Sequence, residues 1–159
     1  MRRNVITIFT VIWVLTCMRA QAQDGIYSIS AQGGLNYKSA IFTSLSLNLP
    51  KKYAAAHEIS ANYYRSFGTD KYENLLIGFN VKPVLGRGKN SLFYLRAGAY
   101  AGTDLNGFTA APNIGFQWVQ SLSPVLDFTI TNNNGVYFWT ERNHRWRATG
   151  QIGLQLRIK

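Results

Sequence analysis

Cysteine, histidine and charged residues are scarce in this chain of 159 residues. It has one Cys and two His, which excludes a disulfide framework and any metal site built from cysteines. Charged residues make up 15% of the chain, against about 25% in ordinary soluble domains. Aromatic residues reach 14%. Disordered chains show the opposite balance, with much charge and few aromatics. We therefore expect a single folded domain without a metal or other cofactor.

Acidic residues are the scarcer of the charged types. Lys and Arg number 17 against seven Asp and Glu, which gives a formal net charge of +10. Such a balance suggests nucleic acid, anionic lipid or another phosphate-rich surface as a partner. Direct contact with nucleic acid is not expected, because most aromatic side chains needed for base stacking lie on the apolar faces described below.

The first 22 residues have the pattern of a secretory signal peptide. A basic start, Arg2-Arg3, precedes a mostly apolar stretch over residues 5–18, and Ala20-Gln21-Ala22 fits a cleavage site. The apolar stretch is shorter than the roughly 20 residues of a membrane-spanning helix. We predict cleavage after Ala22, which leaves residues 23–159 as the mature domain. An uncleaved anchor, or lipidation of Cys17, is the alternative.

Polar and apolar residues alternate with a period of two throughout the mature chain, as they do in half-buried strands. In residues 74–84, every second residue from Leu75 to Val81 is apolar, and Asn80 and Lys82 lie on the other face. The pattern predicts eight strands, over residues 27–37, 41–49, 57–66, 74–84, 91–101, 108–120, 125–139 and 146–158. Asn134-Gly135 carries a turn signal that would create an extra hairpin. We prefer one long strand over 125–139.

The length and chemistry of these strands distinguish a transmembrane barrel from a soluble one. They have roughly 9 to 15 residues, whereas five or six are common in soluble sheets and about 9–11 cross a bilayer. Their polar faces carry small uncharged residues, which suit a lumen better than a water-facing exterior. We predict an all-β, eight-stranded antiparallel up-and-down transmembrane barrel, apolar outside and polar inside. Aromatic residues near the predicted strand ends would form its girdles: Tyr27, Tyr37, Phe67, Phe93, Trp118, Phe138, Trp139 and Trp146.

An even number of strands places both termini at the same end of the barrel, which we assign to the periplasm. Outward loops would be 36–40, 67–73, 102–107 and 140–145, and periplasmic turns would be 50–56, 86–90 and 121–124. Eight strands leave an interior that side chains fill, so an open pore is not expected. The predicted polar cluster of the lumen consists of Glu58, Lys82, Arg96 and Asp127, whose two carboxylates offset part of the basic charge.

The densest basic cluster is Arg142, Arg145 and Arg147, close to the last outward loop. If that loop is extracellular, these guanidinium groups are candidates for contact with anionic lipid, such as the phosphates of lipopolysaccharide. A generic charged rim is the alternative interpretation.

Several segments resemble the TraO family of Bacteroidetes conjugal transfer proteins. They are Lys82-Pro83-Val84-Leu85-Gly86-Arg87-Gly88-Lys89-Asn90, Gly98 to Asp104, Ile114-Gly115-Phe116, Asn133-Asn134-Gly135-Val136-Tyr137-Phe138-Trp139 and Gly150-Gln151-Ile152-Gly153-Leu154. The resemblance implies an outer-membrane barrel within a conjugation apparatus. It implies contacts with membrane lipid and with other proteins of that apparatus. It implies no catalytic residues.

The predicted function is therefore that of a non-enzymatic structural barrel in the outer membrane. One alternative is a small outer-membrane barrel of the lipid A-modifying type. Such an enzyme needs a Ser, a His and an acid within hydrogen-bond reach. His57 and Ser60 face opposite sides of their strand, as do His57 and Glu58. Another alternative is a secreted soluble barrel that binds an apolar ligand inside.

Overall fold

The computed structural model describes residues 26–37, 40–51, 55–67, 72–104, 107–140 and 145–158. The predicted signal peptide, its cleavage site and Cys17 lie outside the described residues. The strands are β1 Tyr27–Asn36, β2 Ala40–Pro50, β3 Ala56–Ser66, β4 Glu73–Lys82, β5 Val84–Arg87, β6 Ser91–Asp104, β7 Gly107–Ser121, β8 Leu126–Val136 and β9 Trp146–Ile158. Among the described residues, no helix is long and apolar enough to cross a membrane.

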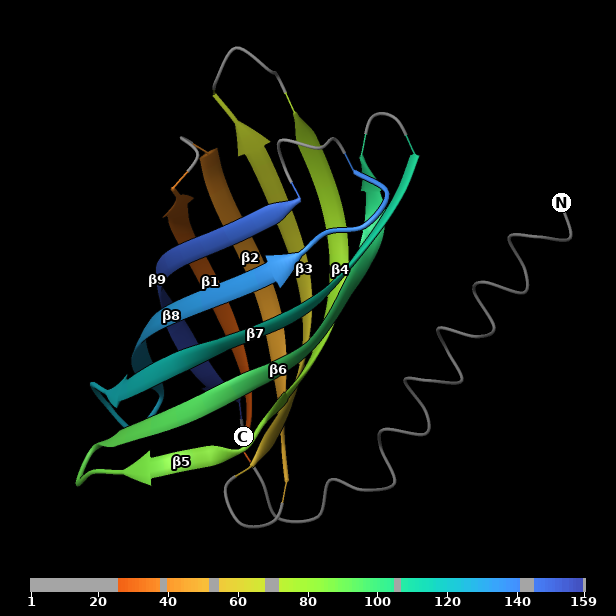
Figure 1. Ribbon diagram of the computed structural model, residues 1–159. Helices are drawn as coiled ribbons and strands as arrows, with labels where there is room; N and C mark the ends of the chain where they lie inside the picture. The colour runs from red at the N-terminus through yellow and green to blue at the C-terminus, as the bar shows by residue number, and fades with distance from the viewer. Residues whose placement is uncertain are drawn as a thin grey trace, which may run out of the picture.

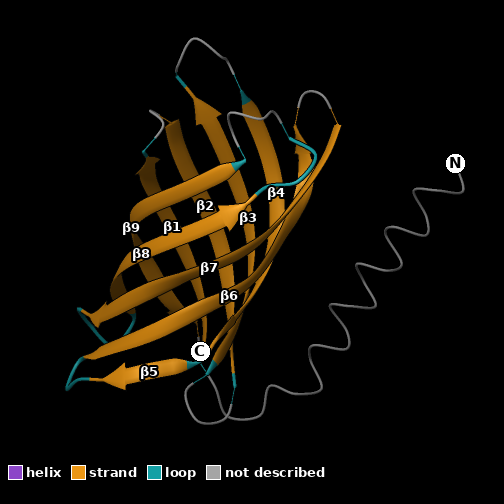
Figure 2. Ribbon diagram, viewed as in Figure 1, coloured by secondary structure: helices purple, strands orange, loops and turns teal. Residues whose placement is uncertain are grey.

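The strands form one closed antiparallel barrel (Figures 1 and 2). Consecutive strands pair with each other, except β4 and β5. The strand β1 also pairs with β9, from Tyr27 opposite Ile158 to Asn36 opposite Thr149. The remaining gap is closed by β4 and β6, which pair from Asn74–Asp104 to Val81–Ala97. Closure leaves no long unpaired edge among the described strands, which is a requirement for strands that cross a membrane.

The short strand β5 continues β4 after an interruption at Pro83. Proline has no N–H to donate to a neighbouring strand, yet its carbonyl still accepts a hydrogen bond from Leu95 N at 3.1 Å. β5 pairs with β6 through a register shift between Val84 and Gly86. β4 and β5 therefore count as one interrupted strand, and the prediction of an eight-stranded barrel is confirmed.

The strand predicted over 125–139 ends earlier, at Val136. Tyr137 N donates to the carbonyl of Arg145, Phe138 makes an isolated bridge to Ala110, and Trp139 adopts a positive φ of 55°. The chain thus bends away from β9, and the last three predicted positions are wrong. The alternative hairpin at Asn134-Gly135 does not form either, because both residues remain paired with β9.

The predicted division into an apolar and a polar face is confirmed. The outward side chains of Leu35, Ile77 and Ile152 are more than 60% exposed, although they are aliphatic. Polar side chains point inward, and Ser30, Asn80 and Gln117 are completely buried. The ladders of β9 with β1 and β8 contain no register shift, so the alternation of faces continues along the whole of β9.

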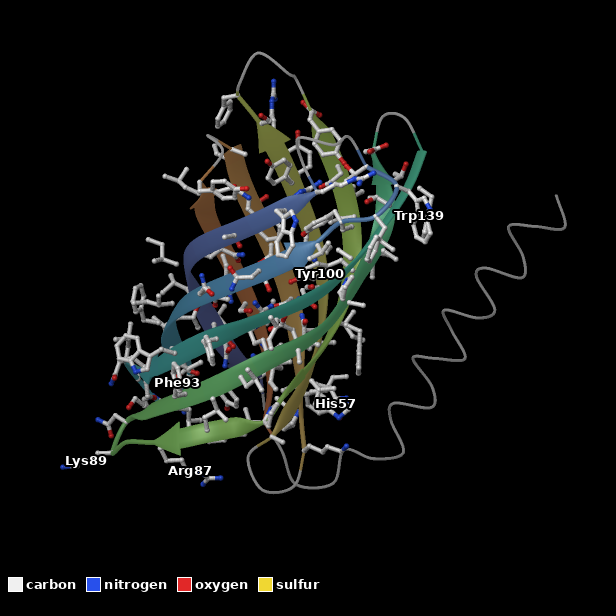
Figure 3. The ribbon with its side chains drawn as sticks, in the orientation of Figure 1. His57, Arg87, Lys89, Phe93, Tyr100 and Trp139 are labelled. Atoms are coloured by element: carbon white, nitrogen blue, oxygen red, sulfur yellow. The ribbon has the colours of Figure 1, made fainter. Side chains whose placement is uncertain are left out.

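Aromatic side chains lie on the outer surface of the barrel near both of its ends. Trp139 lies at the end that carries the β8–β9 connection, and its ring centroid is 5.8 Å from that of Phe108. Phe93 lies toward the other end and stacks on Phe116 at 5.7 Å (Figure 3). The hairpins β1–β2, β3–β4, β6–β7 and β8–β9 share the first end, called the loop end below. The start of β1 and the end of β9 lie at the second, called the terminal end.

Candidate functional site

The candidate site is the polar interior of the barrel, and its centre is Glu58 on β3. Glu58 Oε2 lies 3.3 Å from Lys82 Nζ on β4, and Oε1 contacts the guanidinium of Arg96 on β6. All three side chains are at most 4% exposed. Asn80 Nδ2 donates to the same carboxylate at 3.0 Å, and Lys82 donates to Asn48 Oδ1 at 2.6 Å. The structure therefore brings Glu58, Lys82 and Arg96 together on the inner face, which is the face that the alternation predicts for each of them.

A chain of amides extends this cluster across the lumen. Asn113 Nδ2 on β7 donates to Asn80 Oδ1 at 2.8 Å and to Asn133 Oδ1 at 3.2 Å. Asn133 Nδ2 on β8 in turn donates to the hydroxyl of Tyr100 at 2.6 Å. Tyr100 reaches into the interior from β6 (Figure 3). Side chains from β3 to β8 are linked at this level, so the lumen is occupied by a hydrogen-bonded network.

Asp127, the fourth predicted member of the lumen cluster, points inward but lies in a separate group. It forms a bidentate ion pair with Arg157 on β9, in which Arg157 Nη2 lies 2.5 Å from Asp127 Oδ1 and Arg157 Nε lies 3.0 Å from Asp127 Oδ2. Gln155 Nε2 also donates to Asp127, and Arg157 Nη2 donates to Ser121 Oγ at 2.9 Å. Asp127 therefore compensates Arg157 near the terminal end and not the cations around Glu58.

A third interior group surrounds Arg147 near the loop end. The guanidinium carbon lies 3.7 Å from the ring centroid of Tyr137, 4.1 Å from that of Tyr64 and 5.2 Å from that of Tyr72. Arg147 Nη2 also donates to the hydroxyl of Tyr72 at 3.2 Å. Cation–π contacts of this kind are strongest where water is excluded.

The prediction that Arg147 contacts anionic lipid does not hold, because this side chain is only 3% exposed inside the barrel. Trp146 takes the outward position on β9, and Arg147 is in phase with the inward Thr149. Arg145 is exposed, in agreement with a place on the rim. Arg142 lies outside the described residues. The alternation along β9 contained the signal that places Arg147 inside, whereas Arg145 precedes the first residue of that strand.

Tyr72, a residue that sequence reasoning did not single out, links this group to the neighbouring loops. Its hydroxyl donates to Asp104 Oδ2 at 2.9 Å and lies 2.5 Å from Thr140 Oγ1. Burial raises the pKa of Tyr72 and also that of Tyr137, so both phenols remain neutral at ordinary pH. Neutral rings can lie against a guanidinium and still donate a hydrogen bond, which stabilises this group of side chains at the loop end of the lumen.

The described residues do not assemble a hydrolytic triad around His57. Its ring lies on the outer face, with its centroid 5.4 Å from that of Phe79, while Ser60 is buried inside. His57 Nε2 has no hydrogen-bond partner among the described residues. His144 lies outside them. Within the same ranges, no group of His, Cys, Asp and Glu could hold a metal ion.

An apolar exterior between two aromatic zones, around a polar and filled lumen, is typical of small transmembrane β-barrels. Comparison with known proteins agrees at the level of the fold. No family model and no curated protein matches this chain.

Several solved structures are similar to it over most of their length. Neisserial surface protein A superposes with a TM-score of 0.62 at 13% identity, over 85% of this chain and 98% of that one. The Yersinia pestis outer membrane protein Ail gives 0.58 at 12% identity, over 85% and 100%. The outer membrane enzyme PagL gives 0.56 at 12% identity, over 82% and 99%. At such identities the likeness establishes the fold alone.

Proposed function

We propose that this protein is a non-enzymatic β-barrel of the outer membrane and a structural component of a conjugative transfer apparatus. The observation that carries the membrane assignment is the outward apolar surface. Large apolar side chains such as Leu45, Leu75 and Leu154 are more than half exposed around the barrel. Contact with lipid removes this surface from water, which is the main favourable contribution to burial of apolar groups.

The filled interior argues against a secreted carrier of an apolar ligand. Such a carrier needs apolar side chains around an internal cavity, as in soluble barrels that hold one small ligand. Here the middle of the lumen holds Glu58, Lys82 and Arg96, together with buried amides and hydroxyls. An apolar molecule would have to displace hydrogen bonds and ion pairs without replacing them.

The absence of an enzymatic role is supported by the geometry around His57. The imidazole faces outward and Ser60 faces the lumen, so neither can activate the other. The similarity to PagL concerns the fold and brings no catalytic residue with it. A barrel without a reactive group would act by anchoring or contacting other proteins.

The conjugative role is supported by the segments that resemble the TraO family. Two of these segments contain residues of the interior side-chain groups and the places where a strand is interrupted or ends. The segment 82–90 begins at the Lys82 of the central ion cluster and includes the break at Pro83. The segment 133–139 contains Asn133 of the amide chain, Tyr137 of the Arg147 group and the bend after β8. The partners proposed are outer-membrane lipid and other proteins of the apparatus.

Two experiments test the two parts of the proposal separately. Recovery of the protein from membranes only with detergent, with a heat-modifiable shift on gels, would support a closed membrane barrel. A monomer that stays dissolved in plain buffer would refute it. Affinity purification from cells that carry the parent mobile element should recover transfer proteins together with this chain. Recovery of the barrel alone would refute the conjugative role and leave the fold untouched.

A further inference from the structure

Two asparagines on β8 interrupt the apolar exterior. Asn132 is exposed on the outer face and Asn134 is half-exposed beside it. The outward residues of the same strand on the terminal side are Leu126, Phe128 and Ile130, and the one on the loop side is Val136. On the neighbouring strand β7, Phe116 is opposite Asn132 and Ile114 is opposite Asn134, so the two carboxamides lie within an apolar surface.

The hydrogen bonds of this amide pair are incomplete on its own barrel. Asn134 Nδ2 donates to Asn132 Oδ1 at 2.6 Å and, at 3.4 Å, to the carbonyl of Ile114. Asn132 Nδ2 donates to the carbonyl of Thr149 at 3.4 Å. Asn134 Oδ1 accepts no hydrogen bond from any of the described residues. In hydrocarbon, an amide oxygen without a donor is unfavourable, so these residue types on a lipid-level surface indicate a contact.

The neighbouring strand leaves room for such a contact. Ala148 is directly opposite Asn134 on β9, and Gly150 is opposite Asn132. Both face outward, and a Cβ added at Gly150 would meet no atom within 4 Å. Larger outward side chains, Trp146 and Ile152, border them on β9. The amides thus lie beside small residues, which leave space for another surface to approach closely.

We propose that this surface, formed by Asn132, Asn134, Ala148 and Gly150, is a symmetric interface with a second copy of the chain within the membrane. The inference rests on the proposed membrane location, but not on the conjugative role. A carboxamide both donates and accepts, so the pair is complementary to itself. A two-fold axis brings the same patch of two copies together, so that the carboxamides of one copy face those of the other. The small side chains let the two barrels approach within hydrogen-bond distance.

Disulfide cross-linking in membranes tests the interface directly. The native Cys17 is replaced (Cys17→Ser), and Gly150→Cys introduces one thiol at the proposed contact. Ala61→Cys introduces a matched outward thiol on β3, on the far side of the barrel. Oxidation should convert Gly150→Cys into a covalent dimer and leave Ala61→Cys monomeric. No dimer at Gly150→Cys, equal dimer at both positions, or a cross-link from Gly150→Cys to a different protein would each overturn the proposal.

Variants of the proposed interface test whether the amides of Asn132 and Asn134 cause dimer formation. Asn132→Val together with Asn134→Val should abolish the Gly150→Cys dimer, while Thr43→Val, which removes an outward polar group on β2, should not. Valine suits both a strand and lipid, and a heat-modifiable gel shift checks that each variant folds. Ala148→Trp, which blocks close approach and keeps the amides, should abolish the dimer as well. A dimer that survives both changes contradicts the inference. Recovery of the chain in the soluble fraction would instead refute the membrane location.

Discussion

Replacement of Glu58 by glutamine should destabilise the barrel strongly. Glutamine has nearly the same shape as glutamate, so the change removes a charge and creates no cavity. Lys82 and Arg96 would remain at most 4% exposed and lose the carboxylate that they share. Removing one partner of a buried ion pair typically costs about 3–5 kcal/mol, because the other charge is left uncompensated. With two cations facing one carboxylate, we expect Glu58→Gln to lie within that range.

The measurement is reversible denaturant unfolding of the barrel in phosphocholine vesicles, followed by tryptophan fluorescence. Glu73→Gln is a matched control, because Glu73 pairs with Arg65 at 3.2 Å with side chains 38% and 57% exposed. An exposed pair of this kind contributes about 0–1 kcal/mol. Adding Lys82→Met to Glu58→Gln removes one of the two cations and should restore part of the loss, which a double-mutant cycle quantifies. If Glu58→Gln costs no more than Glu73→Gln, the lumen is effectively aqueous and the reasoning fails.

Three further changes are predicted. Gly98→Ala should lower the free energy of unfolding by about 1–3 kcal/mol, because the added Cβ would meet the backbone of β4. The control is Gly33→Ala, whose added Cβ points into open space and should change the free energy of unfolding by less than about 0.5 kcal/mol. Arg147→Leu should increase proteolysis or hydrogen exchange at the loop end, because Tyr64 and Tyr137 lose the cation that they share. Unchanged protection would contradict a stabilising role of Arg147 at that end. Arg142→Gln with Arg145→Gln should weaken binding to lipopolysaccharide-containing vesicles over phosphocholine vesicles, and equal binding would leave these arginines as a generic charged rim.

The face on which each side chain lies could be predicted from the sequence alone. Successive side chains of a strand point to opposite faces, so a period of two is a local property that needs no knowledge of the partners. Glu58, Lys82 and Arg96 were placed in the lumen by this property, and Leu75 and Leu154 on the exterior. The same property should have placed Arg147 inside, in phase with Thr149. Its neighbours in the sequence, Arg142 and Arg145, suggested an exposed cluster instead.

Only the tertiary structure decided which inward residues meet. Glu58 and Arg96 are 38 positions apart, and they touch because β4 pairs with both β3 and β6 in a definite register. Asp127 had the same inward assignment but lies with Arg157, because the register of β8 and β9 brings that pair together. The end of β8 at Val136 likewise depends on a bridge between Phe138 and Ala110 on another strand. Alternation is set by the backbone of one strand, whereas the contacts inside the lumen are set by the closure and register of all of them.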